Sequence, residues 1–398
     1  MRIWLIIGLM FLATVLNYLD RQVLALTAER IMDEFHLTKE DFGRIISAFR
    51  YSYAIFQIFG GWIVDSRGPG LILPLAVGVW SLAGMLTGLV RSVAALASMR
   101  FMLGIGEAFN WPCALKVTQR LLPPRDRALA NGIFNSGAAA GAVLAPIIIT
   151  FVTLYFGWRF AFVITGGLGG IWIVAWLILS RPLYDRLGGT PLSARQVLRV
   201  MGIVLTKRGF WLLSVSAIII NSVYYFLADW IPLYLKTERG FSFAVGNALS
   251  VIVYISLEAG NILVGLLVRR LVNRGFQVPT ARRIALFIAC LLMSTAILVG
   301  MVPSRGLAVF FLMLTALGVA GFLVIYLTMA QDLEPGYIGI AAGLLGGLGN
   351  LFYGAVSPFI GRLSDLHQTL LTFSVIGLSP WLAFVAIFFA FRERPEQA

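Results

Sequence analysis

Charged residues are scarce in this chain, and their scarcity excludes a soluble protein. Only 12% of the 398 residues are Asp, Glu, Lys or Arg, whereas 59% are hydrophobic. A soluble domain of this length could not hide so much apolar side chain from water. The composition therefore predicts a protein that crosses a membrane many times. The formal net charge of +13 does not indicate a nucleic-acid partner here, because the basic residues fall mostly in short loops, where they report orientation.

Cysteine and histidine are also rare, with two residues of each kind. Cys113 and Cys290 lie in separate apolar stretches without a neighbouring His or second Cys, so neither a disulfide framework nor a metal site is predicted. His36 and His367 fall in predicted loops far apart in the sequence, which leaves little material for a hydrolytic triad or a zinc site. The phosphate-binding pattern GxxxxGK[ST] does not occur. We therefore expect no enzyme, no cofactor and no use of nucleotide energy.

Twelve apolar runs of about 20 residues predict twelve membrane-spanning helices. The first run is long for the core of a secretion signal and contains Asp20 and Arg21, so we interpret it as a span. The runs form two sets of six around a polar stretch at 180–209, and they cover residues 3–30, 42–64, 70–89, 93–118, 128–155, 157–179, 210–235, 243–267, 284–302, 307–330, 338–361 and 370–391. The expected fold is all-α, with six-helix bundles at 1–180 and 210–398 and a cytoplasmic linker at 181–209.

Basic residues collect in three loops that fall on one side of a twelve-span chain. The loops follow the fourth, sixth and eighth spans, and they contain Arg120, Arg125, Arg127, Arg181, Arg186, Arg195, Arg199, Lys207, Arg208, Arg269, Arg270, Arg274, Arg282 and Arg283. The first loop on the opposite side, MDEFHLTKEDF, is acidic. Because cytoplasmic loops are enriched in Lys and Arg, both termini are expected in the cytoplasm.

A weak internal repeat supports the division into two sets. Gly137 and Pro146 are nine positions apart in the fifth span of the first set, and Gly349 and Pro358 have the same spacing in the fifth span of the second. Such coincidences also occur by chance in a chain with 41 Gly and 15 Pro. Two parallel six-helix repeats are nevertheless typical of transporters that rock two bundles around a site at the membrane midplane.

Charged residues inside the apolar runs are the main candidates for function. An Asp or Arg at the centre of a membrane helix costs about 2.5 to 3.5 kcal/mol on insertion scales, so Asp20 and Arg21 are expected to face something other than lipid. Arg100 and Glu107 are seven residues apart and share one helical face two turns apart. If the first helix is their neighbour, Asp20 and Glu107 can share the positive charge of Arg100, and one proton would neutralise the group. An open alternative is a static ion-pair network that holds the helices together.

Five stretches of the first half together resemble one transporter family. They are NYLDRQ, GGWIVDSRGPG, RFMLGIGEAFNWP, GIFNSGAAAGAVLAPI and GWRFAFVITG. They resemble the anion:cation symporter family of the major facilitator superfamily, and within it the bacterial hexuronate and galactonate transporters. LADWIPLYLKTERGFS and LEAGNILVGLL in the second half are similar to that family less sharply.

The resemblance implies a proton-coupled symporter of the major facilitator fold in the bacterial inner membrane. It would import a small organic anion, a hexuronate or related sugar acid, by alternating access, and it would work as a monomer among membrane lipids. Alternatives that stay open are another carboxylate (aldarate, aromatic or dicarboxylic acid), sodium coupling, and a membrane sensor that transports nothing.

The resemblance also implies roles for single residues. Arg21 takes the substrate carboxylate through its planar fork, Asp20 and Glu107 take part in proton coupling, and Arg100 links them. Three further positions match residues that line the family's cavity, although ordinary packing stays open for the last two: Tyr18, Tyr53 and Asn350.

Arg50 departs from the family, which usually carries an uncharged residue at this position. It lies three residues before Tyr53 on the same helical face. It can add a second positive group to the cavity, favouring a dianion such as an aldarate, or lie near the membrane surface with its charge in water. Asp229 and Glu258 are further charges in apolar runs, and the sequence assigns them no role.

The loop after the second span resembles the superfamily's gating motif in part. Gly61, Asp65 and Gly68 are in place, Arg67 is displaced by one position, and Ser66 stands where Arg is usual. The resemblance implies a cytoplasmic gating contact at Gly61, Asp65, Arg67 and Gly68.

Overall fold

Helices make up nearly all of the chain that the structure describes, which is residues 2–189, 193–331 and 338–390. In this computed structural model none of those residues lies in a β-strand. The first half contains α1 (Arg2–Leu26), α2 (Ala28–Phe35), α3 (Lys39–Arg67), α4 (Pro69–Thr87), α5 (Val93–Glu107), α6 (Asn110–Leu121), α7 (Pro124–Phe156) and α8 (Trp158–Ser180). The rest contains the 3-10 helix η1 (Arg181–Leu187), α9 (Ala194–Leu205), α10 (Arg208–Asp229), α11 (Ile231–Thr237), α12 (Phe243–Asn273), α13 (Val278–Ser294), α14 (Ala296–Met301), α15 (Arg305–Gln331), α16 (Ile338–Asp365) and α17 (Thr369–Ala390).

Ten helical segments within the described residues are long and apolar enough to cross a membrane, so the chain is a multi-pass membrane protein. Each lies on a predicted span. The two other predicted spans, 42–64 and 93–118, correspond to α3 and to α5 with α6. Arg50 and several polar residues lower the hydropathy of α3, and α5 has only 15 residues because the chain turns at Ala108 and Phe109 before α6. The helices therefore fit the twelve predicted spans.

Local sequence signals explain where several helices begin and end. Thr38 caps α3 by accepting a hydrogen bond from the backbone N–H of Asp41 at 3.1 Å, and the Asp41 carboxylate accepts one from the backbone N–H of Thr38. Gly68 ends α3 at a φ of 85°, a conformation that favours glycine, and Pro69 then begins α4. Gly157 has the same φ between α7 and α8. These short turns make successive helices antiparallel neighbours.

The chain forms two compact units, and each is described by itself. Unit 1 comprises Met1–Val197, Ala228–Val251 and Gly354–Gly361, and unit 2 comprises Leu198–Leu227, Ile252–Tyr353 and Arg362–Ala398. The expected bundles at 1–180 and 210–398 differ from this division mainly in two segments. Residues 228–251 and 354–361 group with the first six spans.

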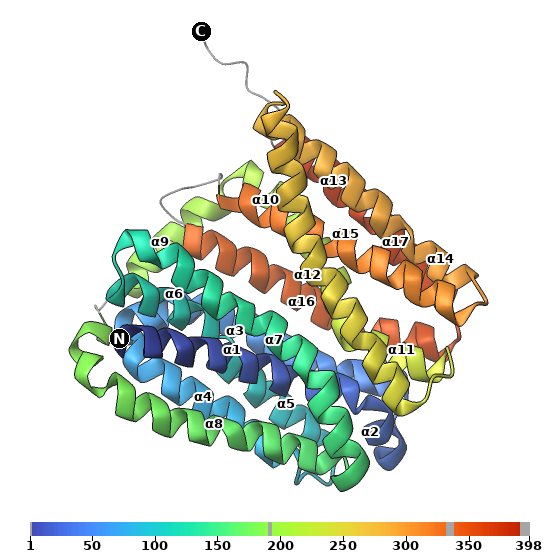
Figure 1. The fold of residues 1–398 in the computed structure, drawn as a ribbon, viewed down its shortest axis with the longest axis horizontal. Coiled ribbons are helices and arrows are strands. Elements are labelled where there is room, and N and C mark those ends of the chain that lie inside the picture. The colour runs from blue at the N-terminus through green and yellow to red at the C-terminus, as the bar shows by residue number, and fades with distance from the viewer. Residues whose placement is uncertain (1, 190–192, 332–337, 391–398) are drawn as a thin grey trace. The chain divides into compact units, whose positions relative to one another are not determined.

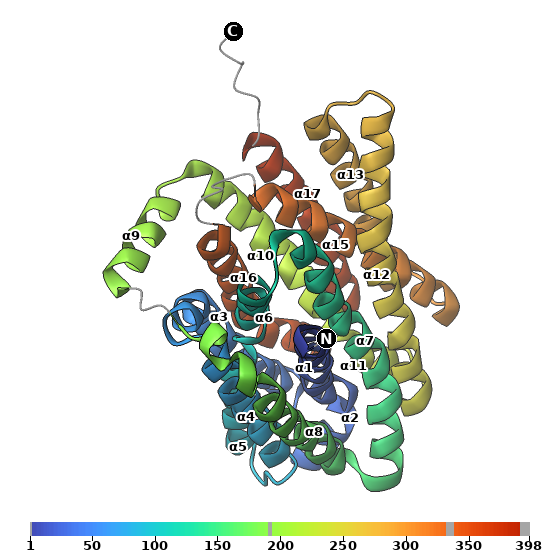
Figure 2. The same cartoon turned by 60° about the vertical axis from the view of Figure 1, so that its left-hand side comes forward.

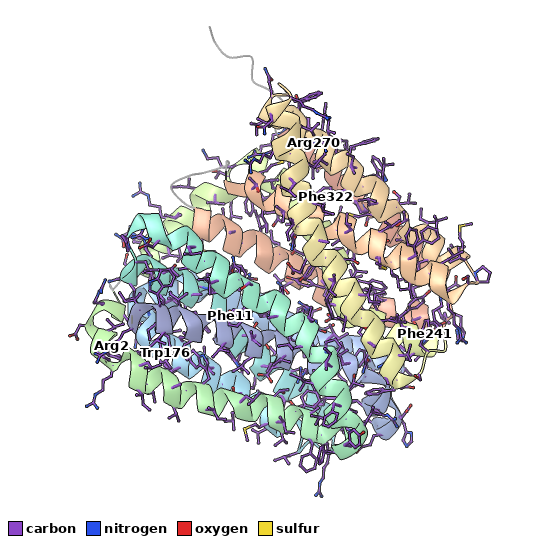
Figure 3. All side chains as sticks on the ribbon, in the orientation of Figure 1. Arg2, Phe11, Trp176, Phe241, Arg270 and Phe322 are labelled. Carbon is purple, nitrogen blue, oxygen red and sulfur yellow. The ribbon has the colours of Figure 1, made fainter. Side chains whose placement is uncertain are left out.

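In unit 1, α1 lies against both α7 and α8 (Figures 1 and 2). A Cβ on Gly137 of α7 would lie 2.5 Å from the backbone oxygen of Phe11, which Figure 3 labels on α1. On the α8 side, the Trp172 indole N–H donates to the backbone oxygen of Leu9 at 2.7 Å, and its ring stacks on Trp176 with the centroids 5.3 Å apart. Small residues and indole hydrogen bonds thus fix α1, the helix that carries Asp20 and Arg21.

In unit 2, α13 lies beside both α15 and α17 (Figure 1). A Cβ on Gly318 of α15 would lie 2.7 Å from the backbone oxygen of Ala289 on α13. The Trp381 indole N–H of α17 donates to the Ser294 hydroxyl of α13 at 2.9 Å. Arg270 lies near the end of α12 that leads to α13, as Figure 3 shows, and its side chain is exposed.

Candidate functional site

An ion pair between α1 and α5 lies at the centre of the candidate site in unit 1. Arg21 donates two hydrogen bonds to one oxygen of Glu107, from Nε to Oε2 at 2.9 Å and from Nη2 to Oε2 at 2.7 Å. Glu107 is fully buried. Its other oxygen, Oε1, has no hydrogen-bond partner among the residues that the structure describes. One oxygen of this carboxylate is therefore saturated while the other has room for a proton.

Aromatic rings enclose the Arg21 guanidinium. Its central carbon lies 5.2 Å from the ring centre of Tyr18, 5.3 Å from that of Phe49 and 5.0 Å from that of Tyr53. Its Nη2 also lies 3.4 Å from the amide oxygen of Asn17, one helical turn away. Cation–π contact stabilises a guanidinium without using up its hydrogen-bond donors. The structure thus brings Tyr18 and Tyr53 to Arg21, as the sequence predicted, whereas Phe49 and Asn17 were missed.

Arg100 and Asp20 are buried with few hydrogen bonds to compensate their charges. Each is 2% exposed. Within the described part of the chain, Nε and Nη2 of Arg100 have no hydrogen-bond partner, and the Asp20 carboxylate has a weak contact with the side chain of Thr165. Arg100 rests on the ring of Phe162 at 4.9 Å. A buried polar group without a hydrogen-bond partner costs about 1 to 3 kcal/mol, and more if it is charged. Binding a proton, a water or a ligand at these atoms would therefore be favourable.

The pairing differs from the arrangement considered for the sequence. Glu107 forms its ion pair with Arg21 of α1, and the charge of Arg100 acts electrostatically on both Glu107 and Asp20. The long Arg21 side chain reaches α5. The roles of these residues in substrate binding and proton coupling stay predictions.

Two glycines of α5 bring other helices to the site. A Cβ on Gly104 would overlap the side chain of Ser52 and lie 2.5 Å from the backbone oxygen of Phe49, both on α3. A Cβ on Gly106 would lie 2.8 Å from the backbone oxygen of Ala76 on α4. These two glycines therefore admit α3 and α4 to α5. The close approach of α3 places Tyr53 and Arg50 beside the ion pair.

Arg50 makes a second buried ion pair, with an acid that the sequence left without a role. Its Nη2 lies 2.8 Å from Oδ2 of Asp229 at the end of α10, within unit 1. Arg50 is 2% exposed and the Asp229 side chain is 13% exposed. The Arg50 charge is therefore buried and paired rather than at a membrane surface.

A small cavity connects these groups. The guanidinium-bearing residues Arg21, Arg50 and Arg100 all line it, together with Asp229 and six apolar residues: Leu24, Ala25, Phe42, Ile46, Phe49 and Leu103. Three cations lining one cavity favour an anionic ligand. In the described part of the chain, no cluster of three or more His, Cys, Asp or Glu side chains is placed to hold a metal ion.

Two other predicted positions lie in unit 2. The amide nitrogen of Asn350 donates to the hydroxyl of Tyr225 and to the backbone oxygen of Gly346, both at 3.0 Å, and Asn350 is fully buried. Glu258 accepts a hydrogen bond from Asn261 at 3.3 Å. Both residues belong to unit 2 and are described within it.

The predicted gating motif lies at the end of α3. Asp65 pairs with Lys116 of α6, with Oδ1 and Nζ 2.5 Å apart. Gly68 meets the chain after α8, because a Cβ there would lie 2.5 Å from the backbone nitrogen of Gly189. Arg67 is exposed, and a Cβ on Gly61 would meet nothing within 4 Å. Asp65 and Gly68 thus have structural partners, whereas the gating role stays a prediction.

Buried ion pairs, unpartnered charges and a cation-lined cavity inside a bundle of apolar helices define a membrane transporter for an anionic solute. Residues 10–351 match the Major Facilitator Superfamily, and the chain belongs to that family. This membership confirms the predicted fold class and the expectation of a transporter rather than an enzyme.

Several relatives cover nearly the whole chain. A hexuronate transporter of Bacillus subtilis is 30% identical over 87% of this chain and 84% of its own length. A D-galactonate transporter of Escherichia coli is 28% identical over 97% of this chain and 95% of its own. A probable galactarate/D-glucarate transporter of Escherichia coli is 27% identical over 97% and 94%.

Solved structures share the fold. A D-xylose-proton symporter superposes with a TM-score of 0.76 over 100% of this chain and 99% of that chain, at 15% identity. An inward-facing, occupied bacterial homolog of the human lysosomal transporter Spinster superposes with a TM-score of 0.73 over 97% and 94%, at 21% identity. At these identities the likeness concerns the fold alone.

Proposed function

We propose that the protein is a symporter that imports a sugar acid, a hexuronate or a related one, together with one or more protons. It works by alternating access as a monomer in the bacterial inner membrane, with both termini in the cytoplasm. The names of the relatives support a sugar acid. The observation that carries the coupling is the Arg21–Glu107 pair, in which both arginine donors meet one oxygen and the other oxygen has no partner among the described residues.

Exchange at Arg21 provides the coupling. A substrate carboxylate presents the same two-oxygen group as Glu107, so it competes for the guanidinium fork. Once displaced, Glu107 would be a buried anion without its cation, which is strongly unfavourable. Protonation of the carboxylate removes that cost. Substrate binding at Arg21 and proton binding at Glu107 therefore favour each other, and this reciprocity is what a symporter requires.

Neighbouring groups serve the same exchange. Asp20 is a second buried carboxylate on the helix of Arg21, and we assign it a further proton. Arg100 lines the cavity and links the two acids electrostatically. The hydroxyls of Tyr18 and Tyr53 lie on rings that contact Arg21, so they suit the hydroxyl groups of a sugar acid. Asn350 provides an amide for the same purpose from the second set of spans.

Uptake of labelled galacturonate into proteoliposomes tests the proposal. The native protein should accumulate galacturonate under an inward proton gradient and exchange it without one. Glu107→Gln keeps the side-chain shape but cannot carry the proton, so it should still exchange the substrate and lose accumulation at least tenfold.

Three outcomes would contradict the proposal in different parts. Normal accumulation by Glu107→Gln removes the coupling role of Glu107. Accumulation that follows an imposed sodium gradient instead of the proton gradient would mean that the coupling ion is sodium. If galacturonate moves in neither mode, the assignment of a hexuronate as substrate is wrong, and a panel of other carboxylates is tested next. If none of these moves, a membrane sensor is favoured.

A further inference from the structure

Two ion pairs of the same construction lie on one cavity. In each, an arginine of the first two long helices pairs with a carboxylate from a different helix: Arg21 with Glu107 at 2.7 Å, and Arg50 with Asp229 at 2.8 Å. All four side chains are at most 15% exposed. Both arginines line the cavity, and so does Asp229.

One aromatic ring connects the two guanidinium groups. The central carbon of Arg21 lies 5.3 Å from the ring centre of Phe49, and that of Arg50 lies 5.4 Å from the same centre. Phe49 is 5% exposed and its own ring lies 5.5 Å from that of Tyr53. Both guanidinium groups therefore lie within 5.4 Å of the centre of one ring that lines the cavity.

Stability alone does not explain the second pair. Replacing a buried ion pair by apolar residues of similar volume is often neutral or stabilising, because the two charges must be removed from water. Inside a membrane, ionisable residues that face a cavity are functional by default.

Charge balance then separates two substrate classes. A monocarboxylate can replace Glu107 at Arg21, but it leaves Arg50 with Asp229. A dicarboxylate whose two carboxyl groups are separated by hydroxylated carbons can replace both protein carboxylates. Glu107 and Asp229 then each take up one proton, so the dianion is accompanied by one proton more than a monocarboxylate.

We propose that Arg50 binds a second carboxylate of the substrate, and that the preferred substrate is therefore a dicarboxylic sugar acid of the aldarate class. This inference rests on the proposed sugar-acid symport and refines its substrate. Asp229 is the group that the distal carboxylate displaces, as Glu107 is the group displaced by the first. Phe49 supports the carbon chain between them.

The test compares two substrates that differ at one end only. Galactarate and galacturonate share the sugar configuration, but galactarate carries a second carboxylate. Uptake of each is measured in proteoliposomes under the same inward proton gradient. We expect a KM for galactarate at least tenfold below that for galacturonate, and one proton more per molecule transported.

The matched variant removes both charges of the second pair. Arg50→Leu with Asp229→Leu leaves no lone buried charge, and it should lower the preference for galactarate over galacturonate at least tenfold. The control variant Lys39→Leu with Glu238→Leu removes another ion pair of unit 1 whose side chains are 12% and 16% exposed and which does not line the cavity. It should leave the preference unchanged.

A charge-reversed variant distinguishes a substrate site from a latch between helices. Arg50→Asp with Asp229→Arg restores an ion pair but moves the guanidinium away from α3. If the pair is a latch only, the reversal restores transport with the native preference, and the proposal is overturned. Loss of the galactarate preference in a variant that elutes as a folded protein supports the proposal.

The remaining outcomes separate this inference from the proposed function. If galacturonate is accumulated and galactarate is no better, the second carboxylate site is wrong while the symporter stands. If the double leucine variant loses both substrates equally, the pair serves the fold or the transport cycle, and the inference is again wrong. If neither sugar acid moves, the proposed function fails and this inference fails with it.

Discussion

The Arg21 guanidinium can stay in position while it changes its carboxylate partner. Its cation–π contacts with three rings persist whichever carboxylate occupies its fork, so the guanidinium stays positioned while its anionic partner changes. Arg100 rests on the ring of Phe162, and two of its nitrogens, Nε and Nη2, have no hydrogen-bond partner among the described residues. The difference suggests that Arg21 is the exchanging cation and that Arg100 provides a fixed positive potential.

Lys236 is a buried cation outside the candidate site. Its Nζ lies 3.0 Å from the backbone oxygen of Leu26, the last residue of α1, and 3.4 Å from the amide oxygen of Asn247. A carbonyl at a helix C-terminus carries partial negative charge that attracts a cation. Burial lowers the pKa of Lys236 to about 8, while Glu29 opposes the shift and Arg30 adds to it. Lys236 therefore loses its proton in the folded protein well below the pH at which it does so in the unfolded chain.

This lowered pKa predicts a stability that rises with pH. Above pH 8 the folded protein releases the proton while the unfolded chain keeps it up to about pH 10.5, so the free energy of unfolding should grow by about 1 to 2 kcal/mol between pH 8 and 9.5. Thermal unfolding in detergent measures the rise. Lys236→Met should abolish it, and Lys207→Met, at an exposed lysine, should keep it. If stability changes with pH equally in both variants, the prediction is wrong.

At the scale of helices, glycine positions decide which pairs of helices approach. Gly104 admits α3 to α5, and Gly137 admits α1 to α7. Without these approaches, the arginines of α1 and α3 would not reach acids on neighbouring elements. The site is thus assembled by backbone contacts about one to three helical turns away from the charged groups.

Gly104→Ala should separate α3 from α5. The added methyl group would lie 2.5 Å from a backbone oxygen of α3, so a helix must shift at a cost of about 1 to 3 kcal/mol. We expect a lower melting temperature and at least a tenfold loss of galacturonate uptake, because Glu107 on α5 moves relative to Arg21. Gly167→Ala on α8 meets nothing within 4 Å and should be neutral or slightly stabilising. Similar behaviour of the two variants would contradict this account of the helix contact.

At the scale of the whole molecule, the distribution of basic loops predicts the orientation in the membrane. The exposed residue Asp33 lies in α2, within the acidic stretch after α1, and the exposed residue Ser193 lies in the central basic stretch. The two native cysteines, Cys113 and Cys290, are fully buried, so they should give little background in a labelling experiment.

Membrane-impermeant maleimide therefore tests the orientation directly. Asp33→Cys should react in intact spheroplasts, whereas Ser193→Cys should react only after the membrane is permeabilised. Reaction of Ser193→Cys in intact spheroplasts would reverse the proposed orientation and place the termini outside. The native protein provides the unlabelled control.

The positions of the spans and of the suspect charges follow from the sequence alone. A span is a local run of about 20 apolar residues, and a charge such as Asp20 or Arg50 is conspicuous inside one. The breaks at Gly68 and Gly157 are likewise local, because each depends on the backbone freedom of one residue. For these features the neighbours in sequence contain the needed information.

The pairing of the charges was decided only by the tertiary structure. Arg21 meets Glu107 across 86 positions, and Arg50 meets Asp229 across 179. Helical periodicity places a residue on a face, but it does not state which helix lies opposite or how far a long side chain reaches. Arg100 was the expected partner of Glu107 because both lie on one face of α5, and Arg21 has that place because its flexible side chain crosses between two helices. Which carboxylate neutralises which guanidinium, and hence where a substrate can enter, is a property of packing rather than of pattern.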